Sequence, residues 1–464
     1  MAHPHFDAVV VGSGFGGAVT AYRLADAGLD VCVLERGKAY PPHSFPRSPH
    51  ALARNFWDPS EGLYGLYNVW SFRNLEAVVA SGLGGGSLIY ANVLIRKDEK
   101  WFVREDPDGR VERWPLTRAD LDPHYDRVER VLNAQRYPFH HPPYDQTPKT
   151  RAFRDAAARL NLSCELPKLA VTFANPGEPP QLGVPIHEER PNLHGRPRLT
   201  CQLCGECDLG CNYGSKNTLD FNYLTEAVRL GALIWTSCEV RTFAPREEGG
   251  YVVRYVRHDP QAHAGRPHDT GRLPLHEITA DHLILSAGTL GTPFLLLKNR
   301  AAFPHLSPML GARFNLNGDY LGFVLHSREE QDGRLVPRVV DPGRGPVVTS
   351  AIRVPDLADG GHLRGHYVED AGYPQHVNWV VEALNAPGGL RRTVAFLLHR
   401  LREALTGRRH SDLSAEIASL LGDARLTATS MPLLGMGRDV PEGTMRLGDA
   451  GYLEIDWSGE RSAY

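Results

Sequence analysis

The chain has 464 residues, of which 42% are hydrophobic and 23% charged, and its formal net charge at pH 7 is −3. This composition predicts a globular protein with several domain-sized units, and the near-neutral charge gives no reason to expect nucleic acid as a partner. No apolar run approaches the ~18 residues that span a membrane, and the first predicted strand starts too early to leave room for a secretory signal. We therefore expect a cytoplasmic protein, in which the seven cysteines do not form a disulfide framework.

The N-terminal segment carries the pattern of a dinucleotide-binding unit. An apolar strand at residues 8–11 ends in the turn GSGFGG, a helix follows, and a second strand ends at Glu35. Gly12 permits the tight turn, Gly14 lets the backbone approach a pyrophosphate, and Gly17 allows close packing of helix on strand. Glu35 is placed to accept hydrogen bonds from a ribose, and its charge would repel a 2′-phosphate. A turn that binds nothing is the alternative, but strand, helix and acidic residue in register disfavour it.

A second glycine cluster, GLGGGS, occupies residues 82–87 and follows another apolar stretch. Consecutive glycines allow very close approach of backbone segments, and their N–H groups can form an anion-binding concavity. A purely structural tight turn is the alternative.

Further along the chain, the patterns predict helices and then an antiparallel sheet. Thr117 resembles a helix N-cap, with Asp120 three residues later completing a capping box. Beyond residue 300, segments of alternating hydrophobicity indicate antiparallel strands of a second domain. The predicted helices are 151–160, 218–230 and 293–299, and the predicted strands are 232–240, 251–257, 282–287, 320–325, 346–352 and 377–384.

Four of the seven cysteines form a run with the spacing C-x2-C-x2-C-x3-C, which bacterial ferredoxins use to ligate iron–sulfur clusters. In those ferredoxins the fourth cysteine serves a second cluster and precedes a proline, whereas here Asn212 follows it and no second quartet exists. Zinc bound by four thiolates is a further candidate, and a tight loop packed beneath a cofactor is the alternative without metal. The run consists of Cys201, Cys204, Cys207 and Cys211.

Five segments in a set order carry a family resemblance: GSGFGG with Glu35, SGLGGGSLIYAN, GCNYGSKNTLDFNYL, LILSAGTLGTPFLL and FNLNGDY. Together they resemble the glucose–methanol–choline (GMC) oxidoreductase family, in particular its bacterial cholesterol-oxidase-like branch. The resemblance covers most of the chain and implies tightly bound FAD and oxidation of an alcohol. It also implies an α/β fold class, in which a Rossmann-like FAD-binding domain with a parallel sheet is interrupted by an α+β substrate domain with an antiparallel sheet. We expect residues 1–100 and 196–300 in the FAD-binding domain and residues 101–195 and 301–464 in the substrate domain.

The resemblance also implies individual contacts to FAD. The first glycine turn would meet the pyrophosphate, Glu35 the adenosine ribose, and the backbone of Val240, at the end of a strand, the adenine. Asn92 falls near the segment that contacts the isoalloxazine ring. The residues implied for the pyrophosphate turn are Gly12, Ser13, Gly14, Phe15, Gly16 and Gly17, and those implied along the flavin are Gly82, Gly84, Gly85, Ser87, Ala287 and Gly288.

The expected chemistry is less complete than the expected cofactor site. The resemblance implies a histidine in a His-Pro-Leu-Gly-Gly-like segment and an asparagine in a Gly-Val-Asn-Pro segment; neither occurs here, so we expect the C-terminal catalytic segment to be missing. His366 and His376 are interpreted as packed or solvated histidines rather than as the base. Glu369 aligns by resemblance with the carboxylate that moves a steroid double bond after oxidation. Burial would raise its pKa into a useful range, and an ordinary exposed glutamate beside Asp370 is the equal alternative.

Residues 390–405, LRRTVAFLLHRLREAL, form a basic amphipathic pattern. Packing of its apolar face on the core is the favoured interpretation, and contact with a membrane surface is the alternative. That face consists of Leu390, Val394, Leu397, Leu398, Leu401 and Leu405.

The function that we expect is FAD-dependent oxidation of the CH–OH group of a hydrophobic alcohol, most of all a 3-hydroxysteroid such as cholesterol. The electrons would pass to oxygen or to an unknown protein. A flavin-binding remnant without catalysis, or an iron–sulfur flavoprotein that transfers electrons, remains the alternative.

Overall fold

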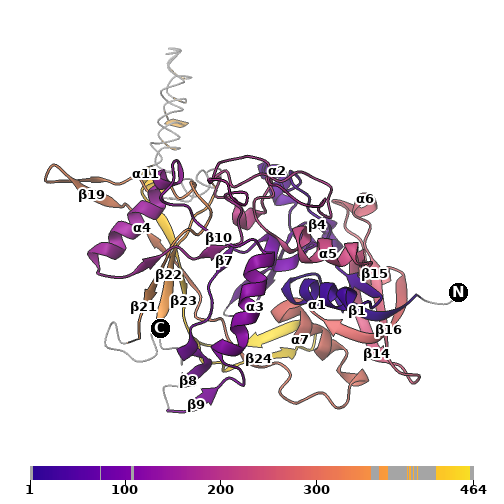
Figure 1. The fold of residues 1–464 in the computed structure, drawn as a ribbon. Helices are drawn as coiled ribbons and strands as arrows, with labels where there is room; N and C mark the ends of the chain where they lie inside the picture. The colour runs from indigo at the N-terminus through magenta and orange to yellow at the C-terminus, as the bar shows by residue number, and fades with distance from the viewer. Residues whose placement is uncertain are drawn as a thin grey trace.

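The computed structural model describes residues 4–73, 75–105, 109–356, 365–374 and 425–459, with five further positions between 394 and 405. Figure 1 shows two sheets at opposite sides of the molecule, one around strands β1 and β16 and the other around β21, β22 and β23. The predicted fold class, a parallel dinucleotide-binding sheet with a separate antiparallel sheet, is confirmed.

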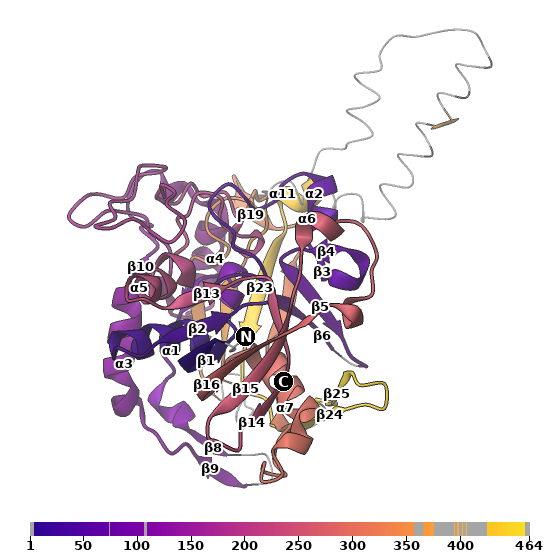
Figure 2. The ribbon, with the colours of Figure 1, turned by 90° about the vertical axis from the view of Figure 1, so that its right-hand side faces the viewer.

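The first sheet has six strands in the order β13-β2-β1-β16-β15-β14. Strand β1 pairs in parallel with β2 and β16, and β2 pairs in parallel with β13, whereas β14 and β15 form an antiparallel extension. Figure 2 shows β14, β15 and β16 running side by side toward α7. The strands span β1 (His5–Val11), β2 (Val31–Leu34), β13 (Leu233–Trp235), β14 (Cys238–Pro245), β15 (Tyr251–Arg257) and β16 (Leu275–Leu285).

Both faces of β1 are buried, which explains its continuous apolar sequence. Because side chains alternate along a strand, Ala8 and Val10 point to one face and Val9 and Val11 to the other. The first pair packs with α1 (Phe15–Asp26) and α5 (Tyr223–Arg229), and the second with residues of β14 and β15 and with Leu295 of α7 (Gly288–Lys298). The sheet thereby holds the end of β1 and the start of α1 in a fixed position.

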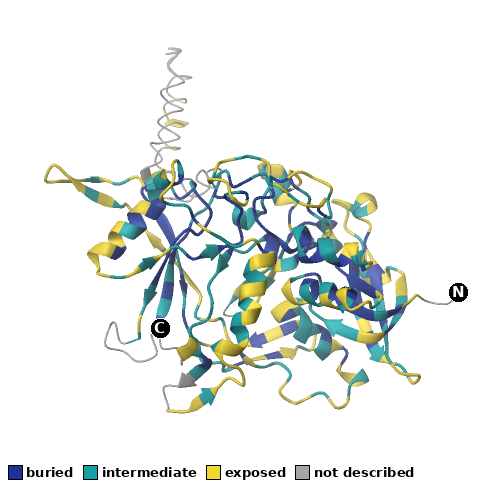
Figure 3. Cartoon of the chain, viewed as in Figure 1, coloured by how far each residue is buried: buried dark blue, intermediate teal, exposed yellow. Residues whose placement is uncertain are grey.

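The second sheet has five strands in the order β11-β21-β22-β23-β18, with all pairs antiparallel. Helix α4 (Pro148–Arg159) covers one face, where Phe153 and Ala157 pack with Ile352 and Val368. In Figure 3 the inner parts of the two sheets are dark blue, and the outward face of α4 is yellow. The strands span β11 (Cys164–Glu165), β18 (Tyr320–Val324), β21 (Ala351–Val354), β22 (His366–Asp370) and β23 (Met431–Met436).

The remaining elements connect the two sheets or pack at their edges. A three-stranded sheet, β17-β24-β25, packs with α7 and the β5–β6 hairpin. The other α-helices in the described part of the chain are α2 (Pro49–Ala53), α3 (Arg118–Val131), α6 (Pro260–His263) and α11 (Arg425–Ala428). The remaining strands are β3 (Trp57–Asp58), β4 (Leu63–Tyr64), β5 (Tyr67–Ser71), β6 (Glu76–Ala80), β7 (Val93–Leu94), β8 (Val103–Glu105), β9 (Val111–Arg113), β10 (Gln135–Arg136), β12 (Lys168–Leu169), β17 (Ala312–Phe314), β19 (Arg328–Gln331), β20 (Arg334–Pro337), β24 (Gly443–Leu447) and β25 (Leu453–Asp456).

Several predicted boundaries are confirmed and others are wrong. Thr117 caps α3 with the expected capping box, and β15 has the predicted bounds. The predicted strand at 232–240 is two strands, because Ser237 has a φ of 56° and turns the chain between β13 and β14. Helix α7 begins five residues earlier than predicted and contains Pro293. The strand predicted at 346–352 begins only at Ala351, and the one predicted at 377–384 lies outside the described residues.

Candidate cofactor and active site

Three glycine-bearing turns, far apart in the sequence, meet at the carboxyl end of β1. The turn after β16 contacts the first turn, because a Cβ on Gly12 would lie 2.5 Å from the carbonyl oxygen of Ser286. The second glycine cluster contacts it from another side, because a Cβ on Gly85 would lie 2.6 Å from the Cα of Gly14. These approaches leave no room for side chains, so the backbone itself lines this rim.

Ser13 joins the first turn to two other segments. Its Oγ donates a hydrogen bond of 2.6 Å to Oε2 of Glu35 and accepts one of 3.0 Å from the amide of Gly84. The Glu35 carboxylate also accepts the amide protons of Ser13 (3.1 Å) and Gly37 (2.8 Å). A carboxylate has about four lone-pair sites, so Glu35 keeps acceptor capacity for a ribose hydroxyl.

The amides of the second glycine cluster bear on the two alternatives left open for it, an anion-binding concavity and a tight turn. Four of them donate within the protein: Leu83 to the Lys38 carbonyl, Gly84 to Ser13, Gly85 to the Gly82 carbonyl and Ser87 to the Gly84 carbonyl. These four amides already have acceptors within the protein, which favours the close-packed turn that the sequence left as the alternative. Ser87 Oγ further ties it down by donating to the Gly84 carbonyl at 2.7 Å.

The N-terminus of α1 offers the free donors instead. Gly14 is its N-cap, and no side chain caps the helix. The first-turn amides have no partner within the helix, and they carry the positive end of its dipole. A Cβ on Gly17 would lie 1.9 Å from the Gly12 carbonyl oxygen, so glycine is required for this helix to start so close to β1.

Asn92 is a buried side chain whose amide has no partner among the described residues. It is 0% exposed, both side-chain polar atoms lack a hydrogen bond, and its φ is 71°. Unpaired buried amides and left-handed non-glycine residues both cost free energy, and both concentrate at ligand sites. The segment around Asn92 lies close to the first glycine turn. The rings of Tyr90 and Phe15 pack edge to face, with their centroids 5.5 Å apart.

The remaining predicted cofactor residues lie in two places. Ala287 is the N-cap of α7, its amide donates to Oγ1 of Thr292 (3.0 Å), and Gly288 has a φ of 82°. Val240 is the third residue of β14 rather than the end of a strand, and its side chain lies in the core of the first sheet. Strand β14 does start beside Glu35, whose carbonyl accepts the amide proton of Cys238 at 2.9 Å.

A buried polar segment, residues 215–220, lies beneath these turns and was not predicted as functional. Lys216 is 1% exposed, and its Nζ donates to the carbonyls of Tyr90 (2.7 Å) and Cys207 (3.0 Å). Burial lowers the pKa of Lys216 to about 8, against the opposing effect of Cys207 and other acidic groups. Asp220 is fully buried and pairs with His194 at 2.6 Å. The motif SKNTLD marked this segment, but its spacing gave no sign of burial.

Glu369 is a buried carboxyl group with no hydrogen-bond partner in the described part of the chain. It lies on β22, is 1% exposed, and neither side-chain oxygen has a hydrogen bond within the described chain. Burial, followed by the nearby charges of Asp370 and Asp319, raises its pKa to about 8. The alternative prediction, an ordinary exposed glutamate, is therefore wrong. Glu369 is instead a buried carboxyl group whose raised pKa brings its protonation change close to neutral pH.

The neighbouring Asp370 has the opposite surroundings. Its carboxylate pairs with Nζ of Lys149 at 2.8 Å, with both side chains fully buried. It also accepts the amide protons of Thr349 (2.9 Å) and Ser350 (2.7 Å). Asp370 thus fastens α4 to the second sheet and is a structural residue.

The structure describes only part of the two candidate histidines and of the amphipathic segment. His366 begins β22 and is half-buried, while His376 lies outside the described residues. Most of residues 390–405 lies outside them as well. The five described members of its apolar face, Val394, Leu397, Leu398, Leu401 and Leu405, are all exposed, so packing on the core is not observed for them.

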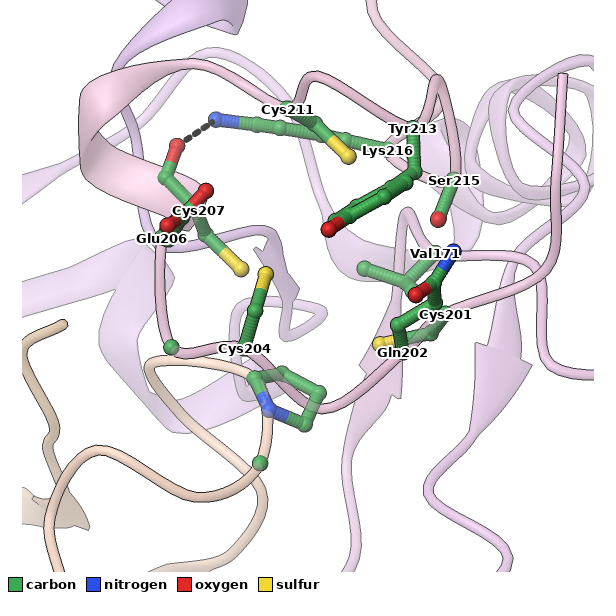
Figure 4. A pocket seen from close by; sticks show the side chains of 13 residues that line it. Val171, Cys201, Gln202, Cys204, Glu206, Cys207, Cys211, Tyr213, Ser215 and Lys216 are labelled. Atoms are coloured by element: carbon green, nitrogen blue, oxygen red, sulfur yellow. Dashed lines mark hydrogen bonds between the residues drawn. The ribbon is translucent and has the colours of Figure 1, made fainter. Parts of the chain in front are cut away.

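The four cysteines of the run all line one small pocket, which is partly open to solvent. All four thiols are free. Figure 4 shows the sulfur atoms of Cys204 and Cys207 next to each other, with Cys211 and Cys201 on other sides of the same space. Within the described residues, no three His, Cys, Asp or Glu side chains are arranged to hold a single metal ion.

A search of the described helices for one that could span a membrane, by its length and its apolar character, finds none.

The strand order and the turns at the end of β1 define a dinucleotide-binding α/β protein. Residues 7–142 match the family model described as FAD dependent oxidoreductase, and residues 180–317 match that of GMC oxidoreductase. The chain belongs to the GMC oxidoreductase family, whose cofactor is FAD.

Curated relatives agree with this assignment. Cholesterol oxidase of Mycobacterium tuberculosis (strain ATCC 25618 / H37Rv) is 32% identical over 319 residues, which are 68% of this chain and 52% of the relative. Cholesterol oxidase of Acinetobacter baumannii is 27% identical over 354 residues, 75% of this chain and 59% of the relative. The chain thus spans about half the length of these relatives. Among solved structures, pyridoxine 4-oxidase from Mesorbium loti aligns with a TM-score of 0.48 and 17% identity, covering 97% of this chain and 75% of that one.

Proposed function

We propose that this protein binds FAD at the three converging turns and oxidises the CH–OH group of a hydrophobic alcohol, first of all a 3-hydroxysteroid. The convergence of the turns carries the proposal, because Gly12, Gly14 and Gly85 leave a rim that side chains would fill. The unpaired amide of Asn92 and the spare acceptor capacity of Glu35 fit the same ligand. FAD, when bound, supplies the acceptor for the substrate's hydride.

Each part of the rim has a role in binding. The first-turn amides of α1 hold the pyrophosphate, and Glu35 accepts from the ribose hydroxyls. Asn92 donates to or accepts from the flavin ring, which satisfies its buried amide. The domain boundaries at residues 100, 195 and 300 belong to this proposal too, since the first sheet is built from residues 5–34 and 233–285.

Glu369 supplies proton transfer at the substrate. Its carboxyl group is protonated at neutral pH and becomes a base as the pH approaches about 8. As a carboxylate, it takes a proton from the carbon next to the new carbonyl group and returns it further along the ring system, which brings a double bond into conjugation. The relatives named cholesterol oxidase support a sterol as the substrate and oxygen as the acceptor.

The exposed apolar residues of the 390–405 segment support peripheral contact with a membrane, from which a sterol would be drawn. Arg391, Arg392 and Arg402 give this segment the charge that anionic lipids attract. Binding to anionic vesicles at low salt, lost when Leu397 and Leu401 are both changed to serine, is the expected result. Equal binding by that variant would contradict this role.

The test of the proposed function uses the full chain, produced with ample riboflavin. After FAD release on denaturation has been measured, cholesterol, a long-chain alcohol and a short polar alcohol are added in turn without oxygen, and bleaching of the flavin absorbance is followed. We expect fastest bleaching with cholesterol. Bound FAD that no alcohol bleaches would instead favour a flavin-binding remnant, and a colourless protein would contradict the cofactor itself.

A further inference from the structure

Lys216 is a buried lysine that forms no ion pair within the described part of the chain. Its side chain is 1% exposed, and its Nζ donates to two backbone carbonyls, that of Tyr90 at 2.7 Å and that of Cys207 at 3.0 Å. Burying an ammonium group without a counterion is costly, and an apolar side chain of similar length would avoid that cost. What the lysine adds at this position is its two hydrogen bonds.

One of the two carbonyls belongs to a firmly held turn. Cys207 opens a short 3-10 turn, and Figure 4 shows the Lys216 side chain reaching across to its carbonyl oxygen. Arg47 holds both ends of this turn, since its guanidinium donates to the carboxylate of Glu206 (2.7 Å) and to the Gly210 carbonyl (2.5 Å). The cysteine loop is therefore a fixed point for the ammonium group.

The other carbonyl belongs to the segment that carries Asn92. Among the described residues, Lys216 is the only donor to the Tyr90 carbonyl, and its Nζ also lies 4.8 Å from the centre of the Tyr90 ring. Two residues further on, the carbonyl of Asn92 accepts the amide proton of Ala170 at 2.9 Å. Lys216 and Ala170 thus hold this segment at positions 90 and 92.

The two anchors belong to stretches of chain that are tied to each other. The amide of Asn217 donates to the carbonyl of Ala170 (2.8 Å), and the amide of Thr172 donates to the carbonyl of Ser215 (2.9 Å). These bonds lie on either side of an antiparallel bridge that includes Lys216. A single unit therefore fixes the segment at both positions.

Asn92 needs such support from its surroundings. Its φ of 71° lies in the left-handed region, which costs free energy for a residue with a side chain, and its fully buried amide has no hydrogen bond to a described residue. Residues in this condition persist only where the surrounding structure over-determines them, and they cluster at ligand sites. The bonds at positions 90 and 92 supply that constraint.

We propose that Lys216 is a positioning residue for the cofactor: by holding the Tyr90 carbonyl, it keeps Asn92 in the conformation in which its side-chain amide meets the flavin. The inference rests on the proposed function, because it requires FAD at the three turns. Lys216 acts through Asn92, which gives the buried 215–220 segment a role in the cofactor site.

The experiment is a double-mutant cycle on the FAD dissociation constant of the full chain, measured by equilibrium dialysis. Asn92→Gly removes the side-chain amide and tolerates the left-handed φ, so it deletes only what Lys216 positions. Lys216→Met alone and Asn92→Gly alone should each weaken FAD binding about tenfold, as for the loss of one hydrogen bond. The double variant should bind FAD no more weakly than Asn92→Gly, since no amide is left to position.

Lys149 provides the matched control, a fully buried lysine of α4 that pairs with Asp370 at the second sheet. Lys149→Met should cost stability, as urea unfolding of flavin-free samples measures, without changing FAD affinity in either Asn92 background. If Lys216→Met weakens FAD binding by the same factor in both Asn92 backgrounds, or not at all, the lysine is purely structural and the inference is overturned. An unchanged protein that binds no FAD would overturn the proposed function, and this inference with it.

Lys216→Gln covers the case in which Lys216→Met does not fold. Its amide group can still donate to a carbonyl and carries no buried charge. We expect it to weaken FAD binding less than Lys216→Met, and only in the chain that keeps Asn92. Equal weakening in the Asn92→Gly background would contradict the inference.

Discussion

Strand β22 carries two neighbouring carboxyl groups with opposite surroundings, one on each of its faces. Asp370 points toward α4, where a fully buried lysine and two backbone amides satisfy its charge. Glu369 points to the other face, where it is just as buried and has no hydrogen bond to any described residue. The difference separates a residue that holds the fold together from one whose acidity is available for chemistry.

The physical reason lies in the cost of burying a charge. A buried carboxylate persists only when partners replace its lost hydration; without them the group stays protonated to a higher pH. For Glu369 the pKa is accordingly raised to about 8. An unpaired acid is costly to keep, and such groups concentrate at functional sites.

The largest effect on stability is expected from breaking the buried ion pair of Asp370 and Lys149. Replacing Asp370 by alanine leaves the ammonium group of Lys149 buried without its counterion, which should lower the free energy of unfolding by about 3–5 kcal/mol. Urea unfolding measures this loss. Lys149→Met in the same background should recover part of it, since it removes the unpaired charge. A loss below about 1 kcal/mol would show that the ion pair does not support the sheet.

A substitution at Glu369, which has no hydrogen bond to a described residue, should affect activity rather than stability. Glu369→Gln should leave the unfolding free energy at pH 7 unchanged or increased, because it removes the cost of keeping the carboxyl group protonated above its ordinary pKa. It should slow isomerisation of the oxidised steroid about 100-fold, which is the low end of general acid–base effects. The ultraviolet absorbance of the conjugated ketone follows that step, and flavin bleaching follows oxidation separately. Full isomerisation by this variant would remove Glu369 from the mechanism.

Two neighbouring glycines of the second cluster, Gly85 and Gly86, provide a matched pair of variants for FAD binding. Gly85→Ala must accommodate a φ of 54° and a Cβ 2.6 Å from Gly14, whereas a Cβ on Gly86 meets nothing within 4 Å. We expect the Gly85 variant to weaken FAD retention by roughly 10-fold or more, through strain of about 1–2 kcal/mol. Gly86→Ala should retain FAD like the unchanged protein. Equal FAD content in both variants, after dilution and dialysis, would mean that the close approach does not shape the cofactor site.

The pH dependence of stability tests the ionisation of Glu369 separately from its role in catalysis. Because the folded pKa of Glu369 lies near 8 and its ordinary value near 4.5, the folded state binds more protons between these values. Stability therefore falls as the pH rises through this window, by at most about 1.4 kcal/mol per pH unit. Asp319, whose pKa is raised to about 6 mainly by burial, adds to the fall. Unfolding curves from pH 5 to 8 should thus be flatter for Glu369→Gln, and identical slopes would show that Glu369 is ionised in the folded protein.

Local sequence patterns predicted the first sheet and the first turn well. Gly12, Gly14 and Gly17 stand in a motif whose strand, turn and helix are contiguous, so their roles follow from short-range geometry. The capping box at Thr117 is equally local. The break at Ser237 was missed because apolar residues lie on both sides of Thr236 and Ser237 and no glycine or proline marks the turn, so only the backbone conformation divides the strands.

The candidate site depended on contacts that local patterns do not contain. Ser13 joins Glu35 and Gly84 across long stretches of chain, and nothing in the sequence marks that hydroxyl as the link. The burial of Glu369 and Lys216 also arises from packing between distant elements. The family resemblance pointed to Glu369, but its missing partners and raised pKa are properties of the folded chain.

The most direct test of the account is the FAD content of the full chain, produced with ample riboflavin and then denatured. The converging turns predict a yellow protein that releases FAD in an amount close to that of the polypeptide. A correctly folded, colourless protein that releases no FAD would contradict the central claim.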